Sequence, residues 1–291
     1  LIPMEDVGYV NALLCNLDVL LPTRDTDPSE RNVALWKIIE SGAHAMQKDD
    51  LRAIESCFVF AAVWAFGSSL SEKDGEYYRQ KFSDWFKSEF KGTKFPSRDT
   101  VFDVYLDPLS NKLEPWKSSP YFEPVSFDSQ SQEMSSVTVP TPETCSVSFW
   151  MHEMVKRGRP VMLVGLAGVG KTQLVNGLLT SLDPEDHLAS VINFNFYTNS
   201  KALQNTLEGP LEKKAGVNFG PPGKANMIFF VDDLNLPEVD LYGTQSAIAL
   251  LRQHMDYGHW YDRGKLTAKN ILNTQYLACL NPTAGSFTIN P

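Results

Sequence analysis

The sequence predicts an α/β protein in which a parallel sheet flanked by helices follows a smaller, mostly helical subdomain. Two observations predict this class. From about Val137 onward, short continuous apolar segments alternate with segments of helical periodicity, a pattern typical of sheets covered by helices on both faces. Before residue 125, helical periodicity dominates. The chain has 291 residues, which is room for about two domains of roughly 150 residues each.

The composition excludes several classes of protein. Hydrophobic residues make up 43% and charged residues 21% of the chain, which argues against wholesale disorder. The longest uninterrupted apolar run, Cys57–Phe66, has ten residues, whereas a membrane-spanning helix needs about 20. The formal net charge of −9 disfavours a basic, phosphate-tracking surface. We therefore expect neither a membrane nor nucleic acid as a partner.

The cysteines indicate a cellular compartment, and the chain ends indicate a longer polypeptide. The four cysteines lie far apart without C-x-x-C spacing, which argues against a disulfide scaffold and favours a reducing, intracellular compartment. The chain opens at Leu1 without an initiator methionine and stops at Asn290-Pro291. We expect both ends to continue into a longer polypeptide.

Helical periodicity predicts four helices in the first 90 residues. The third is apolar nearly all round and is therefore expected to be central. The fourth starts with a capping-box-like pair, Ser71 and Asp74. Its aromatic stripe is expected to be core, with a partner-docking surface as the alternative. The four helices span about 7–21, 30–46, 49–68 and 71–90, and the stripe comprises Phe82, Trp85 and Phe86.

A proline-punctuated segment follows, in which residues 101–106 and 113–116 are typical of strands. Residues 126–136 are rich in Ser and Gln and are expected to be a linker. The linker separates a helical, lid-like subdomain with a strand-containing connector, residues 1–125, from the α/β part, residues 137–291.

The α/β part is expected to alternate helices with strands. The Lys201–Lys224 stretch contains Gly-Pro-Pro-Gly and is interpreted as a mobile loop. The expected helices span about 144–156, 174–182, 200–207 and 244–255, and the expected strands span 161–164, 191–196, 227–231 and 276–280.

A phosphate-binding pattern stands between the first of these strands and an amphipathic helix. Residues 165–172 match G-x-x-x-x-G-K-[ST] at every fixed position. Glycines let the backbone wrap, so that its N–H groups and the helix N-terminus can hold phosphate oxygens. Lys171 is expected to reach the β- and γ-phosphates and Thr172 to ligate Mg²⁺. The alternative is a plain Gly-rich turn. The residues are Gly165, Leu166, Ala167, Gly168, Val169, Gly170, Lys171 and Thr172.

Two aspartates follow the apolar strand 227–231. Asp232 lies 61 residues after Lys171, with a strand and a helix between them, so the two strands have room to be neighbours in the sheet. A carboxylate at this strand end is expected to hold the Mg²⁺ water shell. The alternative is that Asp232 and Asp233 form a turn or a helix-entry pair.

Asn281 follows the strand 276–280 and precedes Pro282. Ligands of open α/β sheets bind at the carboxyl ends of the strands. Asn281 is therefore a candidate to hydrogen-bond the γ-phosphate and an attacking water, with an Asn-Pro turn as the alternative.

His254 and His259, near two aspartates, invite a metal site, but their spacing of five and the lack of a nearby cysteine argue against zinc. Asp262-Arg263-Gly264 instead predicts a hairpin turn between residues 259–261 and 265–267. The sequence has no nucleophile-elbow pattern, so triad chemistry has no support.

The order of P-loop, acidic strand end and polar strand end resembles an AAA+ ATPase module. The sequence of the later segments most resembles the third AAA+ module of a dynein heavy chain of the axonemal kind. This resemblance is strong over about 137–291. Over 1–125 the helices resemble, more weakly, the lid of the preceding, second module. The segments that carry the resemblance are Val139–Thr144, Pro160–Thr172, Phe230–Pro237, Leu251–Asp262 and Cys279–Phe287.

The resemblance implies a P-loop NTPase fold and a ring of six such modules in one long chain, with nucleotide between successive modules. It implies that Lys171 and Thr172 are the Walker A pair, Asp232 the Mg²⁺ acid and Asn281 the sensor. It also implies that residues 137–140, Val137 and Val139 among them, line the adenine side.

One residue departs from the family pattern. Most hydrolysing sites of this family have Glu after the Mg²⁺ acid, and this chain has Asp233, one methylene shorter. A general base must lie within about 2.6–3.2 Å of its water, so we expect slow or conditional hydrolysis. The sequence also ends before an arginine finger or the module's own lid, so we expect little turnover from this chain alone.

The resemblance thus implies an ATP-binding AAA+ module that regulates a minus-end-directed microtubule motor of cilia and flagella. The implied cofactors are ATP or ADP and Mg²⁺. The implied partners are neighbouring AAA+ modules of the same chain and, through regions outside this sequence, dynein intermediate and light chains and microtubules. The implied location is cytoplasmic, in the axoneme. The alternatives are a structural nucleotide-holding module without turnover and an unrelated P-loop ATPase.

Overall fold

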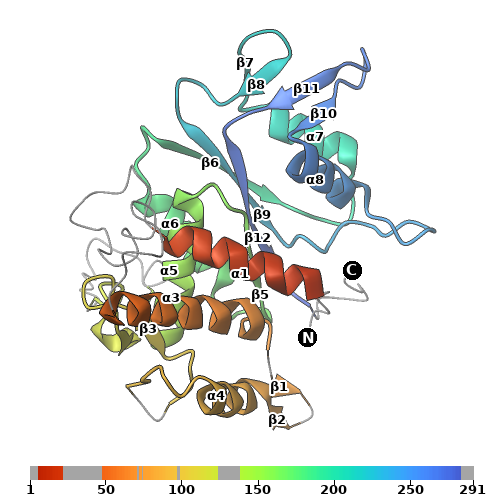
Figure 1. Cartoon of the computed structure of the whole chain (residues 1–291). Coiled ribbons are helices and arrows are strands. Elements are labelled where there is room, and N and C mark those ends of the chain that lie inside the picture. Colours follow the sequence, from red (N-terminus) through yellow and green to blue (C-terminus); the bar gives the residue numbers. More distant parts are fainter. Residues whose placement is uncertain are drawn as a thin grey trace, which may run out of the picture. The chain divides into compact units, whose positions relative to one another are not determined.

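The computed structural model describes residues 6–21, 48–70, 72–73, 75–96, 99–123 and 138–282 (Figure 1). The chain divides into two units, Leu1–Glu153 and Met154–Pro291. The expected helix over 30–46, the linker over 126–136 and the capping pair at residues 71 and 74 lie outside the described residues.

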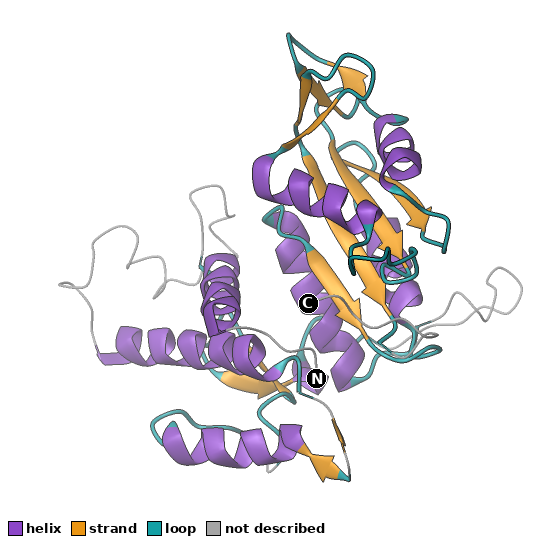
Figure 2. Cartoon of the chain, turned by 90° about the vertical axis from the view of Figure 1, so that its right-hand side faces the viewer, coloured by secondary structure: helices purple, strands orange, loops and turns teal. Residues whose placement is uncertain are grey.

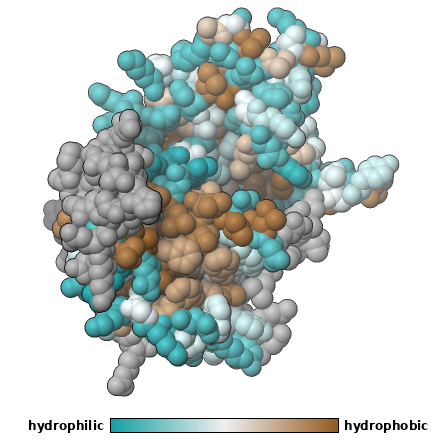
Figure 3. Space-filling model, in the orientation of Figure 1, coloured by the Kyte–Doolittle hydropathy of each residue, from teal (hydrophilic) through white to brown (hydrophobic). Residues whose placement is uncertain are grey.

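Helices dominate the first unit, as predicted. The helix α3 (Lys48–Gly67) is central, because residues 59–63 are all at most 2% exposed. It packs against α1 (Asp6–Leu20), whose Asn16 side chain donates a hydrogen bond to Ala61 O at 3.0 Å. Several apolar residues of α1 face outward, since Val7, Val10 and Leu14 are more than half exposed. Figure 3 shows hydrophobic residues gathered on this face of the unit.

Aromatic residues fill the core of this unit. Trp116 is fully buried, and its indole Nε1 donates to Phe102 O at 2.9 Å. Phe60 of α3 stacks on Trp150 with ring centroids 5.3 Å apart. Trp150 lies on α5 (Pro142–Lys156). The predicted strands are present as the antiparallel pair β3 (Val104–Leu106) and β4 (Leu113–Pro115).

The start of the fourth helix was predicted wrongly. The helix α4 spans Tyr78–Glu89 and follows a short hairpin, β1 (Glu72–Lys73) and β2 (Glu76–Tyr77). Gly75 turns this hairpin with φ +76°, which glycine adopts freely. Of the aromatic stripe, Phe86 is buried and Trp85 is 55% exposed, so the stripe is only partly core.

A four-stranded parallel sheet forms the second unit (Figure 2). Its order is β5 (Val161–Val164), β12 (Thr274–Leu280), β9 (Asn226–Asp232) and β6 (His187–Asn193). The expectation that β5 and β9 have room to be neighbours is wrong, because β12 lies between them and pairs with both. Strand β6 also begins four residues and ends three residues earlier than predicted.

Helices cover the sheet, as the all-apolar strands predicted. One core cluster packs α7 (Ser200–Glu208) and α8 (Ser246–Tyr257) on alternate residues of β9 and β12. The helix α6 (Lys171–Ser181) contacts β12 and lies on the opposite side of the sheet in Figure 1. Strand side chains alternate between faces, so the two helix layers bury different residues of each strand.

A second sheet, ordered β10-β11-β8-β7, extends this unit. The predicted hairpin is present as β10 (His259–Tyr261) and β11 (Ala268–Ile271). The mobile loop expected over Lys201–Lys224 is corrected, because residues 201–208 belong to α7 and the following residues include β7 (Glu212–Lys213) and β8 (Asn218–Gly220). Strand β8 pairs with β11, about 50 residues away, and local composition cannot reveal such a partner.

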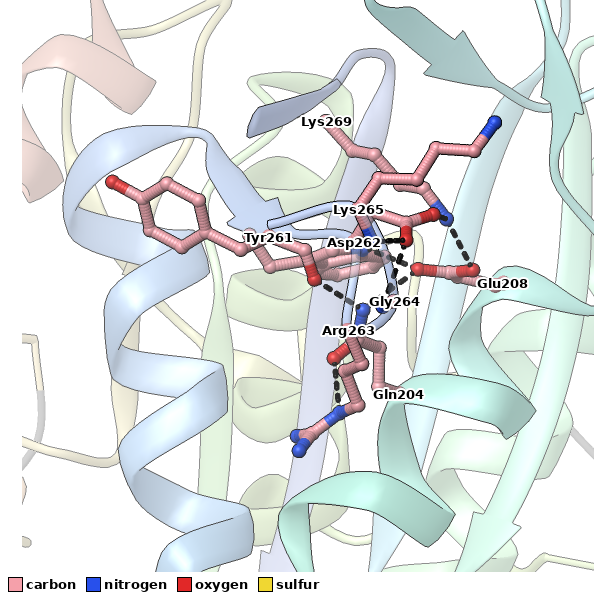
Figure 4. Close-up of polar contacts among 9 residues, drawn as sticks. Gln204, Glu208, Tyr261, Asp262, Arg263, Gly264, Lys265 and Lys269 are labelled. Carbon is pink, nitrogen blue, oxygen red and sulfur yellow. Dashed lines mark hydrogen bonds and ion pairs between the residues drawn. The ribbon is translucent and has the colours of Figure 1, made fainter. Parts of the chain in front are cut away.

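Side chains tie this second sheet to α7 (Figure 4). Glu208 accepts hydrogen bonds from Trp260 Nε1 at 2.8 Å and from Lys269 Nζ at 2.9 Å. Lys269 also pairs with Asp262 at 3.0 Å, and Arg263 Nε donates to Gln204 Oε1 at 2.7 Å. These part-buried bonds hold the hairpin against the helix.

In the part of the chain that the structure describes, no helix has the length and apolar content needed to cross a bilayer.

Candidate functional site

The candidate site lies where β5, β12 and β9 end. In the parallel ladders, Leu280 is level with Val164 of β5, and Ala278 is level with Val231 of β9. The backbone N–H of Gly165 donates to Leu280 O at 3.2 Å. The Gly-rich loop, the aspartate pair and Asn281 therefore leave the sheet at one edge, as the sequence predicted.

The loop after β5 takes a backbone shape that requires glycine at two positions. Gly168 and Gly170 have φ of +79° and +86°, in the left-handed region that L-residues with side chains avoid. The helix α6 begins directly afterwards, and Leu174 N donates to Gly170 O at 3.0 Å. A helix N-terminus preceded by such a loop directs backbone N–H groups outward and favours a bound anion.

Lys171 stands at the start of α6 and folds back over the loop. Its Nζ donates to Gly165 O and to Leu166 O, at 2.8 Å each. These two carbonyl groups hold the ammonium group beside the loop mouth. A phosphate group that entered the loop would lie close to the Lys171 ammonium group. It would compete with the two carbonyl groups for the hydrogen bonds that this ammonium group donates.

Thr172 and Asp232 meet at the centre of the site. Thr172 Oγ1 donates a hydrogen bond to Asp232 Oδ2 at 2.8 Å, although 60 positions separate them in the sequence. A hydroxyl and a carboxylate are the hard oxygen ligands that suit Mg²⁺, which usually takes only one or two protein carboxylates. The pair therefore fits a magnesium ion bound together with phosphate oxygens.

Asp233 occupies a turn directly after β9. Its φ is +55°, its backbone N–H donates to Asp232 Oδ1 at 3.1 Å, and its carbonyl accepts from Leu236 N at 3.0 Å. The side chain of Asp233 is exposed. Asp is among the few residues with side chains that tolerate this backbone region, so the turn suits the residue found there.

Asn281 is held by a residue that the sequence analysis missed. Asn235, 5% exposed, donates from Nδ2 to Asn281 O at 2.9 Å. Leu234 N also donates to Cys279 O at 3.0 Å, so the chain after β9 runs against the end of β12. The only sequence signal was a polar residue among apolar neighbours in Leu234-Asn235-Leu236.

Charged groups at the site affect the pKa of a cysteine in the sheet. The pKa of the Cys279 thiol is raised to about 12, mainly by burial and in part by the charge of Asp232, while the charge of Lys171 acts in the opposite direction. A thiol with such a pKa stays protonated and is unreactive near neutral pH. Cys279 is therefore a packing residue of the sheet.

The expected adenine contacts remain predictions. Val137 lies outside the described residues. Val139 belongs to the first unit and is 66% exposed, with its carbonyl 3.5 Å from Thr144 Oγ1.

The histidines weighed as metal ligands have other roles. His254 is buried, its Nδ1 lies 2.7 Å from the Tyr276 hydroxyl, and burial lowers its pKa to about 4. His259 Nδ1 lies 3.1 Å from Tyr257 O. Among the described residues, no group of three or more His, Cys, Asp or Glu side chains is placed to hold a metal ion.

Comparison with known families gives two matches that together span most of the chain. Residues 127–291 match the family described as P-loop containing dynein motor region. Residues 1–118 match the dynein heavy chain AAA lid domain.

Curated relatives agree with these matches. The chain is 54% identical to dynein axonemal heavy chain 9 of Homo sapiens over 238 residues, covering 81% of this chain and 5% of that protein. It is 51% identical to the dynein alpha chain of the flagellar outer arm of Chlamydomonas reinhardtii, covering 84% and 5%. It is 52% identical to the ciliary dynein beta chain of Heliocidaris crassispina, covering 100% and 6%. The chain thus spans about one-twentieth of the length of these relatives.

Proposed function

Because this chain belongs to the family of P-loop containing dynein motor regions, we propose that it is an ATP-binding AAA+ module of an axonemal-type dynein heavy chain. Membership implies nucleotide binding with Mg²⁺ in general terms, and ATP or ADP is the ligand that we propose for this chain. The observation that carries the proposal is the contact of Thr172 with Asp232 at 2.8 Å, beside the glycine-rich loop.

We assign a role to each part of the site. The backbone N–H groups of residues 165–170 and the Lys171 ammonium group would bind the phosphates. Thr172 and Asp232 would hold Mg²⁺, which supplies charge neutralisation to the phosphates when bound. Val137 and Val139 are proposed to line the adenine.

The remaining roles concern turnover. Asn281 would hydrogen-bond the γ-phosphate and orient a water, and Asp233 would accept a proton from that water. The shorter side chain of Asp233, compared with Glu, supports slow or conditional hydrolysis, since the base has less reach.

At the level of the whole protein, we propose regulation of a minus-end-directed microtubule motor of cilia and flagella. The names of the relatives support a location in the axoneme. The proposed partners are neighbouring AAA+ modules, and intermediate chains, light chains and microtubules contacted through other regions. We further propose a lid and connector over 1–125, a linker over 126–136 and a nucleotide-binding subdomain over 137–291. The separate family matches to residues 1–118 and 127–291 support this division.

Calorimetry with Mg·ATP and Mg·ADP tests the nucleotide site. Lys171→Ala is expected to abolish binding, because the variant loses the cation at the loop mouth. Lys201→Ala, which removes an exposed lysine of α7, is the matched control and should bind as the unaltered chain does. Equal affinity in the Lys171→Ala variant would reject the site assignment.

A further inference from the structure

A buried amide connects the aspartate turn with the end of β12. We propose that Asn235 is a positioning residue, which sets the place of Asn281 and thereby the preference for ATP over ADP. This inference rests on the nucleotide-binding function proposed above and deepens it. Its basis is the hydrogen bond from Asn235 Nδ2 to Asn281 O at 2.9 Å.

This hydrogen bond lies just beyond the last paired residue of β12. The ladder between β5 and β12 ends at Leu280 paired with Val164, and Leu280 O accepts from Gly165 N. Asn281 is the next residue and lies beyond the last strand pair. A donor at its carbonyl group fixes the main chain from which the Asn281 side chain projects.

Asn235 is itself held firmly. Gln245, 4% exposed, donates from Nε2 to Asn235 O at 3.3 Å and to Pro237 O at 2.6 Å. The turn is also closed by the bond from Leu236 N to Asp233 O. Asp233 and Asn235 are therefore parts of one braced turn, and a shift at either strand end would reach the other.

Packing alone does not account for an amide at this position. Asn235 Oδ1 is buried and has no hydrogen-bond partner among the described residues. A buried polar atom left unpaired costs about 1–3 kcal/mol, a cost that leucine, similar in size, would avoid. The donor bond to Asn281 is the feature that distinguishes asparagine from leucine here.

The proposed role of Asn281 makes the inference specific. ATP carries the γ-phosphate that Asn281 would contact, and ADP lacks it. Loss of the bond from Asn235 should therefore weaken binding of ATP more than binding of ADP. A purely structural role would weaken both ligands equally, because the glycine-rich loop and Lys171 serve both.

The test measures Mg·ADP and a slowly hydrolysed Mg·ATP analogue by calorimetry on the full chain. Asn235→Leu is expected to weaken the analogue about tenfold, the equivalent of one hydrogen bond of about 1.4 kcal/mol, with ADP changed less than twofold. Asn235→Ala, which is smaller, should give the same ratio and serves if the leucine variant does not fold. Gln275→Leu removes another buried amide, from the far end of β12, and should leave the ratio unchanged.

A second variant separates the two proposals. Asn281→Ala should itself weaken the analogue selectively, and adding Asn235→Leu to it should cause little further loss, because the two residues act in series. An unchanged ratio in Asn235→Leu, or full additivity, overturns the positioning role while the nucleotide site stands. If Asn281→Ala leaves the ratio unchanged, both roles fall, and if the unaltered chain binds neither ligand, the proposed function falls.

Discussion

Thr172 at the start of α6 and Asp232 at the end of β9 share a hydrogen bond of 2.8 Å, formed across 60 positions of sequence. A helix that follows β5 and a strand two places away in the sheet thus deliver one hydroxyl and one carboxylate to the same point. Neither side chain is buried, so both are available to a ligand.

Removing the Thr172 hydroxyl should uncouple nucleotide binding from magnesium. We expect Thr172→Val to bind ADP equally well with Mg²⁺ and with EDTA, because the proposed metal site has lost its hydroxyl ligand and keeps only the Asp232 carboxylate. Titrations with and without Mg²⁺ check this. Thr180→Val is the control, since Thr180 lies on the same helix and its hydroxyl donates to Asn176 O, a carbonyl group of that helix. A magnesium dependence that survives in Thr172→Val would contradict the metal assignment.

Turnover should depend on the carboxylate of Asp233. We expect slow phosphate release from the longer dynein chain, and at least a hundredfold slower release from Asp233→Asn, since general bases contribute about 10²–10⁴-fold. A phosphate-release assay measures both. Equal rates in the two proteins would indicate a module that holds nucleotide without turning it over.

The buried His254 should make stability depend on pH. Its pKa falls from 6.5 to about 4 because burial disfavours the charged ring. Between these values the unfolded chain binds a proton that the folded chain does not, so stability is full above pH 6.5 and falls as the pH drops towards 4. The shift corresponds to about 3 kcal/mol.

Urea unfolding at pH 7 and at pH 4.5 checks this dependence. His254→Phe should lose stability at pH 7, because the Tyr276 hydroxyl loses its partner, and should show a flatter pH dependence. His259→Gln serves as the control and should keep the slope of the unaltered protein. A His254→Phe variant with an unchanged slope would show that another group titrates.

Asp262 should govern stability at more acidic pH. The Lys265 N–H, the Lys269 ammonium group and the Gly264 N–H lower its pKa from 3.8 to about 2. The folded state favours this carboxylate, so its contribution is present above pH 3.8 and is lost as the pH falls towards 2.

The matched variants for this carboxylate are Asp262→Asn and Asp256→Asn. Asp262→Asn should be less stable than the unaltered protein at pH 5, because it lacks the ion pair with Lys269. For the same reason it should lose less stability on acidification. Asp256 forms an exposed pair with Arg252 at 3.5 Å, so Asp256→Asn should lose as much stability on acidification as the unaltered protein does. Identical urea midpoints for Asp262→Asn and the unaltered protein at pH 5 would argue against the bracing shown in Figure 4.

Local patterns predicted most of the second unit. Strand β5 spans Val161–Val164 as expected, with the glycine-rich loop and α6 directly after it. The family resemblance is confirmed by the matches over 127–291 and 1–118. Patterns succeeded here because strand, loop and helix follow one another within twenty residues, where spacing and turn chemistry decide the structure.

Features that depend on distant partners were predicted less well. The start of α4 was placed too early, since a glycine turn and a short hairpin precede it. Strands β7 and β8 were taken for part of a loop, although β8 has its partner in β11. Asn235 was overlooked because its acceptor, Asn281 O, lies 46 positions away.

By itself, the sequence determined the residue types of the site: a backbone loop open to phosphate, a cation, a hydroxyl, and polar groups at strand ends. Tertiary structure alone decided that β12 enters the sheet between β5 and β9. All three strands are apolar on both faces, so burial favours every order of them about equally. The choice rests on pairing between distant strands, and it places the end of β12, which Asn281 follows, between the ends of β5 and β9.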